Sequence, residues 1–471
     1  MMLTSLSLRV RTFLLFSGSA AVCSILVGLS HYFAFSRLDE GGVTSAFLIS
    51  GFLSVFAILA VTTTIWLLFD ENVAKPIDRL AAGIRTRAHA GVDALVDLHG
   101  SRFLGDLGPA VQAVTGKLSR VSAETDDEVA IQTARLMAEK AHLAMLLTEI
   151  PVAIILVSPN HRIMLYDGQA ADVLGQVHVP RLSASVFDYF NETELSAAQE
   201  KLSEGRTEAL AQVKCSQGNL RFELRLKKLR QVPGYMILVD GTKARISPDA
   251  ERPLIYDFDL TEHKTEHAIE DRLLQELNFV VFDTETTGLM PNKDEIVQIG
   301  AVRVVKGRIV PGEKLDQLVN PGRSIPPAST KVHRITDAMV ADAPDAGTAV
   351  TKFHGFARDC VMVAHNAPFD MAFLKRHGRI CGLNWDHPML DTVLLSAVLF
   401  GDTEEHSLDA VCIRLDITIA PDLRHTALGD AQATAEALCK MLPILSSRGY
   451  RTFGDVIQQT RKHGRLLKDL N

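Results

Sequence analysis

The fold of the C-terminal part of this 471-residue chain is indicated by the stretch Phe279-Val280-Val281-Phe282-Asp283-Thr284-Glu285-Thr286-Thr287-Gly288-Leu289. Its first four residues are apolar and predict a buried strand. Residues two apart on a strand face the same side, so Asp283 and Glu285 project together. Neighbouring carboxylates repel each other unless a cation lies between them, and Mg²⁺ or Mn²⁺ prefers such oxygen ligands. An Asp-x-Glu tripeptide is common and usually only solvated, so the rest of the chain must supply further ligands.

Two more polar blocks follow later in the chain. Cys360–Ala364 predicts a buried strand that runs into His365-Asn366-Ala367-Pro368-Phe369-Asp370, and the proline is typical of the first turn of a helix. His425-Thr426-Ala427-Leu428-Gly429-Asp430 opens a helix predicted through Ala431–Leu442. We expect His425 on the loop before this helix and Asp430 in its first turn.

These blocks resemble, in order, the motifs of the DEDDh exonucleases, the family of the epsilon proofreading subunit of bacterial DNA polymerase III. The motifs are Asp-x-Glu-Thr-Thr-Gly, His-Asn-x-x-Phe-Asp and His-x-Ala-x-x-Asp, and Val332–Thr336 resembles the family's His-x-Ile-Thr segment. His425 stands where a sister subfamily carries Tyr, so the chain resembles the His branch. The resemblance implies an α/β, ribonuclease-H-like fold over residues 278–445, with a mixed five-stranded sheet flanked by helices.

The resemblance also implies a reaction. Nucleic acid would be hydrolysed from its 3′ end with two divalent ions, Mg²⁺ or Mn²⁺, to release nucleoside 5′-monophosphates. The implied metal ligands are Asp283, Glu285, Asp370 and Asp430, and His425 is the implied general base. The implied substrate contacts are Thr284, Thr286, Gly288, Leu289, His333, His365, Asn366 and Phe369. Leu289 and Phe369 could instead be core residues, and Asn366 a helix cap. Single-stranded DNA is favoured, although the residues alone do not rank DNA above RNA.

Two long uncharged stretches predict a transmembrane hairpin over residues 1–70. Thr12–Phe35 and Val43–Phe69 lack Asp, Glu, Lys and Arg, and each is long enough to cross a hydrocarbon core of about 30 Å as a helix. A cleaved signal peptide is disfavoured because a second stretch follows at once. Basic residues flank the hairpin on the side of both termini: Arg9, Arg11, Lys75, Arg79, Arg85 and Arg87. The positive-inside rule therefore predicts that both termini and the exonuclease domain are cytoplasmic. The resemblance to a bacterial family implies that the membrane is a bacterial inner membrane.

The middle of the chain predicts a helical linker and a small domain. In residues 71–150, Lys75–Leu80 resembles the start of a HAMP-type linker, although any amphipathic juxtamembrane helix fits equally well. Val129, Leu136, Leu143 and Ile150 recur every seven residues, which favours a short parallel coiled coil. Residues 151–241 resemble a PAS-type domain in the order of their elements, without a cofactor motif. We therefore expect a homodimer through these two segments. Residues 242–277 indicate a second linker, and residues 446–471 a basic tail.

The composition of the chain argues against several classes of protein and site. The net charge of −7 argues against a protein that coats nucleic acid along its length. No two of the six cysteines have CxxC spacing, so neither a zinc site nor a disulfide framework is supported. A membrane-anchored exonuclease is the leading hypothesis, and association with a replicative polymerase stays open. The alternative is a membrane signalling or scaffold protein whose nuclease fold only binds nucleic acid, which the intact carboxylate set disfavours.

Overall fold

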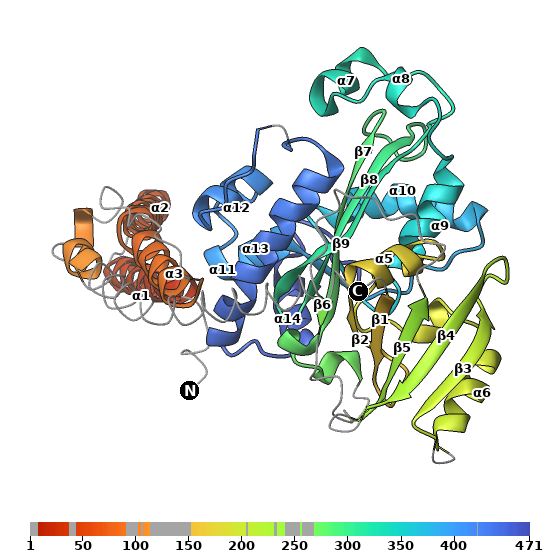
Figure 1. Cartoon of the computed structure of the whole chain (residues 1–471). Coiled ribbons are helices and arrows are strands. Elements are labelled where there is room, and N and C mark those ends of the chain that lie inside the picture. The colour runs from red at the N-terminus through yellow and green to blue at the C-terminus, as the bar shows by residue number, and fades with distance from the viewer. Residues whose placement is uncertain are drawn as a thin grey trace. The chain divides into compact units, whose positions relative to one another are not determined.

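The structure, a computed structural model, describes residues 8–36, 44–90, 102–104, 107–113, 152–203, 206–229, 233–240, 255–256, 268–421 and 423–471. The chain divides into two compact units, Met1–Ala123 and Glu124–Asn471, and each is described by itself (Figure 1). The predicted coiled-coil heptads, from Val129 to Ile150, lie outside the described residues.

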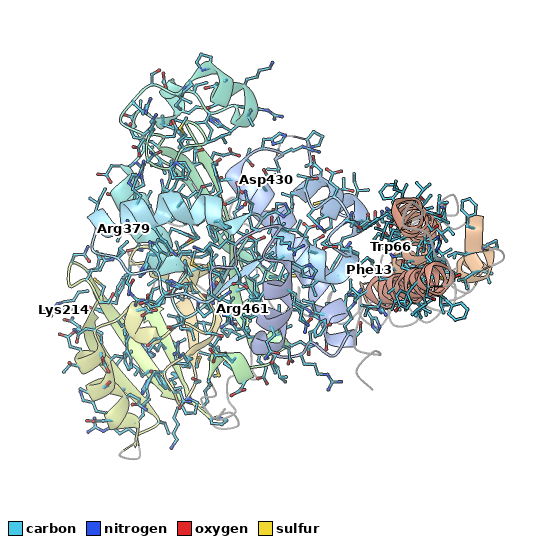
Figure 2. The ribbon with its side chains drawn as sticks, turned by 180° about the vertical axis from the view of Figure 1, so that it is seen from behind. Phe13, Trp66, Lys214, Arg379, Asp430 and Arg461 are labelled. Carbon is cyan, nitrogen blue, oxygen red and sulfur yellow. The ribbon has the colours of Figure 1, made fainter. Side chains whose placement is uncertain are left out.

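The N-terminal unit consists mainly of long apolar helices. Helix α1 (Leu8–Phe35) lies beside α2 (Thr44–Phe69), and a π-helical turn (Asp70–Ala74) continues α2 into α3 (Lys75–Ala90). The rings of Phe13 and Trp66 join the first two helices edge to face, with centroids 5.1 Å apart (Figure 2). By length and composition, two helices of this unit are suited to cross a membrane. Large apolar side chains on them are exposed, as at Phe52, whose exposed fraction is 77%.

The described residues between 152 and 240 form a domain built on an antiparallel sheet, here called the middle domain. Its strands are β1 (Val152–Val157), β2 (Ile163–Tyr166), β3 (Glu208–Lys214), β4 (Arg221–Lys228) and β5 (Tyr235–Asp240). A short β6 (Ile255–Tyr256) completes the order β3-β4-β5-β1-β2-β6, and helices α5 (Gly168–Gly175) and α6 (Glu192–Ser203) connect β2 to β3. Apolar residues in runs or in alternation are typical of β1, β2, β4 and β5. Strand β3 carries alanines at positions 209 and 211, a residue type that does not favour strands.

The C-terminal part is built on a mixed five-stranded sheet in the order β11-β10-β7-β8-β9. Its strands are β7 (Asn278–Thr286), β8 (Ile296–Val305), β9 (Arg308–Leu318), β10 (Val361–Ala364) and β11 (Met389–Asp391). Strand β8 is antiparallel to β7 and β9, whereas β10 is parallel to β7 and β11. The predicted ribonuclease-H-like sheet is confirmed.

Helices cover both faces of this sheet. Helix α13 (Ala427–Ser447) crosses β7, β8 and β9 on one face (Figure 1). On the other face, α9 (Ala346–Phe356) and α10 (Ala367–Ile380) bury Phe353 and Phe373 against Phe282. The other helices are α7 (Pro327–His333), α8 (Asp337–Val340), α11 (Thr392–Phe400), α12 (Leu408–Arg414) and α14 (Phe453–Thr460).

The residues predicted as a basic tail, 446–471, are folded onto this domain. Helix α14 starts with a capping box at Thr452 and buries Phe453 and Val456. At the C-terminus, Asn471 accepts a hydrogen bond from the backbone N–H of Met389 and donates one to its carbonyl, both 2.8 Å long. Because these contacts reach the edge strand β11, the folded region extends beyond the predicted boundary at 445.

The middle domain packs against β8 and β9. Val305 and Val310 belong to the same apolar core as β1, β2 and α5. At this contact, Arg303 donates a 2.7 Å hydrogen bond to Glu313, whose side chain is fully buried. Tyr166 of the middle domain donates a 2.7 Å hydrogen bond to the same carboxylate. The middle domain and the exonuclease sheet therefore share a core and a buried ion pair.

Candidate active site

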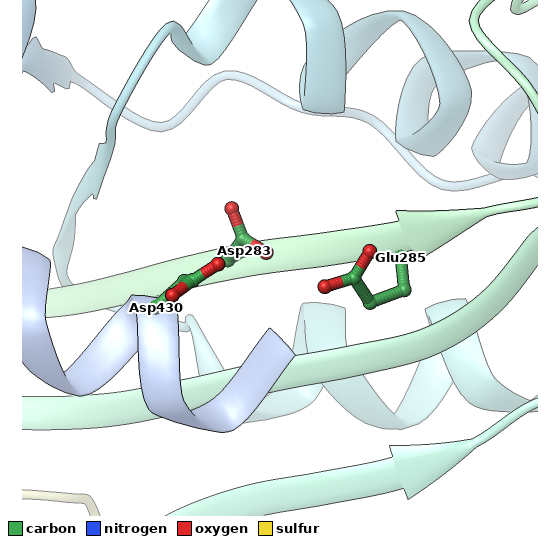
Figure 3. Close-up of side chains that lie close together, drawn as sticks. All are labelled: Asp283, Glu285 and Asp430. Carbon is green, nitrogen blue, oxygen red and sulfur yellow. The ribbon is translucent and has the colours of Figure 1, made fainter. Parts of the chain in front are cut away.

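Three carboxylates meet at one end of the sheet. Asp283 and Glu285 leave β7 on the same face, and Asp430 lies in the first turn of α13. One oxygen of each lies within 4.8 Å of the others, and Figure 3 shows the three side chains turned toward a common space. Such an arrangement offers the oxygen-only ligands that a hard divalent cation prefers.

A glycine in β8 lets α13 approach these carboxylates. Gly300 lies opposite Asp283 in the antiparallel register. A Cβ atom at Gly300 would lie 2.1 Å from backbone atoms of Ala427 and Leu428, so no larger residue fits beneath the helix start. Thr426 caps the helix, with its hydroxyl oxygen accepting a 3.1 Å hydrogen bond from the backbone N–H of Gly429. Asp430 is thereby held next to β7.

The fourth predicted carboxylate, Asp370, lies apart from the group of three. It is 2% exposed in the first turn of α10. One of its oxygens accepts two hydrogen bonds from Thr284, at 3.0 Å from the backbone N–H and 2.6 Å from the hydroxyl. Its charge still acts on Asp283. The structure thus brings three ligand candidates together and holds the fourth beside them.

The surroundings of these carboxylates disfavour their charged forms and so raise their pKa values. Burial raises the pKa of Asp283 well above its usual range, and the charges of Asp370 and Glu285 raise it further. Burial, Asp430 and Asp370 raise the pKa of Glu285 to about 8. Burial raises the pKa of Asp370 to about 7, opposed by the hydrogen bonds from Thr284. A bound cation would remove this repulsion, so the donor set fits a metal site.

His425 lies on the loop before α13, as the sequence predicts. Its backbone is left-handed, with φ of 57°, and the residue is exposed. Burial raises the pKa of Asp430, and the neighbouring His425 opposes this shift. An imidazole therefore lies beside the carboxylate cluster.

The predicted substrate contacts near β7 occupy different surroundings. Leu289 is 81% exposed. Before it, Gly288 fits a tight turn, because a Cβ atom there would lie 2.5 Å from a carboxylate oxygen of Asp294. Thr286 is buried and donates a 2.7 Å hydrogen bond to the carbonyl of Gly288. Thr284 is also buried, so in this structure its hydroxyl contacts Asp370 and faces no open surface.

The other predicted contacts come from later segments. His333 is buried, and its Nδ1 accepts a 3.1 Å hydrogen bond from the backbone N–H of Ile335. His365 shares a 2.8 Å hydrogen bond with the hydroxyl of Thr392, and burial lowers its pKa to about 4, so the ring is neutral near pH 7. Asn366 occupies the N-cap position of α10 at φ 68°, without a side-chain capping bond. Phe369 is half-buried, with its ring 5.3 Å from that of Phe373.

Two residues outside the predicted set of site residues also shape the site. Asp391 is buried and accepts hydrogen bonds from the backbone N–H groups of Ala367 (2.6 Å) and Val393 (2.8 Å), so it fixes the starts of α10 and α11. Burial raises its pKa to about 6. Gln298 is a buried amide in the otherwise apolar beginning of β8. A polar residue inside a buried strand was the available signal for Gln298.

Comparison with known proteins identifies the family. The RNase_T family, described as Exonuclease, matches residues 280–438. A DNA polymerase III subunit epsilon-like protein of Rhodobacter capsulatus is 32% identical over 703 aligned positions, which cover 100% of both chains. The chain belongs to this epsilon-like family. As an epsilon-like protein it carries an exonuclease domain on its ribonuclease-H-like sheet.

Other relatives match a part of the epsilon-like chain. The PolC-type DNA polymerase III of Caldanaerobacter subterraneus is 39% identical over 178 residues, which are 38% of this chain and 12% of that protein. A solved structure of Exonuclease X in complex with 5′ overhanging duplex DNA is 31% identical. It covers 39% of this chain and 99% of its own, with a TM-score of 0.31.

Proposed function

We propose that this exonuclease is of the DEDDh type and removes nucleotides from the 3′ ends of single-stranded DNA as nucleoside 5′-monophosphates. One observation carries the proposal: the oxygens of Asp283, Glu285 and Asp430 converge within 4.8 Å, with His425 on the loop that leads into Asp430. The relatives named after DNA polymerase III favour DNA over RNA as the substrate.

The residues present fit two divalent cations, Mg²⁺ or Mn²⁺. Asp283, Glu285 and Asp430 would hold them, and Asp370 lies close enough to act on Asp283 electrostatically. When bound, such ions stabilise negative charge on the phosphate and make a bound water more acidic. Burial and the neighbouring carboxylates raise the pKa of Asp283 and Glu285, which supports a site that a cation would complete.

The protein's own side chains complete the reaction. A ring nitrogen of the exposed His425 accepts a proton from the attacking water, as a general base. Thr284 keeps Asp370 in place through its two hydrogen bonds. The exposed Leu289 offers an apolar surface to the terminal base. His365, which is neutral near pH 7, lies beside Asn366 near the start of α10.

The test uses the full chain in detergent, because the middle domain shares a core with the exonuclease sheet. Single-stranded DNA labelled at its 5′ end should shorten progressively with Mg²⁺. Asp283→Asn, which keeps the size of the side chain, should lower the rate about a thousandfold through loss of a metal ligand. Asp342→Asn, at an exposed position, is the control. Wild-type activity in Asp283→Asn would overturn the proposal.

Two further measurements define the chemistry. His425→Ala should lower kcat by about 10²- to 10⁴-fold, as expected for loss of a general base. A 3′-labelled strand should release its label as a mononucleotide at once, whereas digestion from the 5′ end would release it last. A matched RNA strand tests the preference for DNA.

We also propose that α1 and α2 anchor the protein in a bacterial inner membrane, with both termini and the exonuclease domain in the cytoplasm. Their exposed apolar side chains and the basic residues next to them, such as Lys75 and Arg79, support this. The full chain should sediment with membranes after a carbonate wash, whereas the chain without residues 1–70 should not. Sedimentation of both forms would contradict anchoring by this hairpin.

The middle domain is proposed to be a PAS-like module that supports a homodimer together with the preceding linker. The order of its strands and helices, as found between Val152 and Asp240, supports the PAS-like assignment. Light scattering of the full chain in detergent, corrected for bound detergent, should give twice the monomer mass. A monomer at all concentrations would exclude the dimer and leave the exonuclease proposal untouched.

A further inference from the structure

Gln298 is a buried polar residue whose amide oxygen and amide nitrogen both form hydrogen bonds. The residue lies in β8 and is 7% exposed. Its Oε1 accepts a 3.1 Å hydrogen bond from the backbone N–H of Ala427, and its Nε2 donates a 2.7 Å hydrogen bond to Asp316 on β9. A backbone N–H can only donate, so the oxygen must face Ala427. The amide therefore has one orientation that serves both partners.

The two partners of Gln298 place it between the sheet and the catalytic helix. In the antiparallel register it lies opposite Glu285 on β7. Ala427 is the first residue of α13, between the exposed His425 and the ligand candidate Asp430. A single side chain thus joins the strand beside Glu285 to the helix start that carries the other groups.

The first turn of a helix has N–H groups without partners inside the helix. Thr426 satisfies one of them, at Gly429, and Gln298 satisfies the one at Ala427. Gly300 lets the helix start lie directly on β8, so nothing bulkier separates the two elements. Removal of the Gln298 oxygen would leave a buried donor unpaired, which favours a shift of the helix start.

We infer that Gln298 is a positioning residue for this active site, which sets the distance of Asp430 and His425 from Asp283 and Glu285. This inference rests on the proposed function. Displacements of about 1 Å at a catalytic group can cost 10²-fold in rate. Residues that orient metal ligands typically change metal affinity or activity by about 10- to 100-fold when they are replaced.

The test compares three variants of the full chain in detergent at saturating Mn²⁺. Gln298→Met keeps the size of the side chain and removes the acceptor. It should lower kcat per folded molecule about 10- to 100-fold, with the KM for DNA nearly unchanged, and should weaken Mn²⁺ binding in calorimetry by a similar factor. Gln298→Glu alone should also lose activity, because it sets a second carboxylate against Asp316.

The pair Gln298→Glu with Asp316→Asn supplies the rescue. It keeps the net charge, offers an oxygen to Ala427 and reverses the hydrogen bond between positions 298 and 316. We expect kcat within a fewfold of the wild type. Wild-type kcat and Mn²⁺ affinity in Gln298→Met would overturn the inference. So would a lower melting temperature with unchanged kcat per folded molecule, or a double variant no better than Gln298→Glu.

If the proposed function is wrong, the activity measurements differ from those expected for a wrong role of Gln298. In that case the wild type and Asp283→Asn are both inactive on DNA. The Mn²⁺ titration still tests Gln298, because the proposed binding of Mn²⁺ by Asp430 does not depend on DNA as the substrate. Equal Mn²⁺ affinity of wild type and Gln298→Met would then reject the positioning role.

Discussion

The hydroxyl of Tyr166 in the middle domain donates a 2.7 Å hydrogen bond to Glu313 on the exonuclease sheet. The same carboxylate accepts a 2.7 Å hydrogen bond from Arg303, and these charged side chains are 2% exposed or less. Burial and the Glu313 charge hold the pKa of Tyr166 well above its ordinary value, so the phenol stays a donor. One carboxylate therefore ties together two domains that lie far apart in the sequence.

Removal of this carboxylate should destabilise both domains. Glu313→Ala leaves Arg303 buried without its counter-charge, and breaking a buried pair in this way costs about 3–5 kcal/mol in the free energy of unfolding. Urea denaturation followed by circular dichroism measures the loss. The double variant Glu313→Leu with Arg303→Met should recover part of it, because no buried charge is then left unpaired but the hydroxyl of Tyr166 still lacks its acceptor. A loss no larger than that of the exposed control Glu200→Ala would contradict the importance of the pair.

The exonuclease part should be less stable without the middle domain. A fragment of residues 268–471 exposes Val305, Val310 and the Arg303–Glu313 pair, which the middle domain covers in the full chain. Hydrogen exchange at the amides of β9 should therefore be faster in the fragment, and the fragment should aggregate more readily. Equal protection in the two proteins would show that the domains fold independently.

Divalent ions should stabilise the protein against heat. The carboxylates of Asp283, Glu285 and Asp430 repel one another at their separation of 4.8 Å or less, and a cation removes this repulsion. At a concentration 100 times the dissociation constant, Mn²⁺ should add about 2.7 kcal/mol. EDTA should reverse the rise in melting temperature. Asp283→Asn should lose most of the rise while Asp342→Asn keeps it; an equal rise in both would place the ion elsewhere.

The hydroxyl of Thr284 should contribute to both the stability and the kcat of the enzyme. Thr284→Val keeps the shape and removes the 2.6 Å hydrogen bond to Asp370, which should cost about 1.5–3 kcal/mol of stability and lower kcat. Thr284→Ser keeps the hydroxyl and should retain most of the activity. The comparison of kcat and melting temperature between the two variants is the measurement. Equal activity in Val and Ser variants would mean that the backbone hydrogen bond alone fixes Asp370.

The local structure of this protein follows from short stretches of its sequence. Alternation on β7 put Asp283 and Glu285 on one face, and the buried stretch before His365 gave β10 and the start of α10. The order of three motifs predicted the exonuclease family and the mixed sheet. Two long uncharged stretches predicted α1 and α2. Each of these follows from side-chain periodicity or from motifs a few residues long.

How these elements pack against one another depends on contacts between residues far apart in the sequence. Gly300 and Gln298 place the start of α13 on β8. Thr284 holds Asp370 through a hydrogen bond, and Glu313 accepts a hydrogen bond from the middle domain. Such contacts join residues up to 147 positions apart, as between Tyr166 and Glu313. Periodicity reports which face of an element is apolar, but it does not report which other element will cover that face. Strand register and helix packing settle this through the burial of whole surfaces.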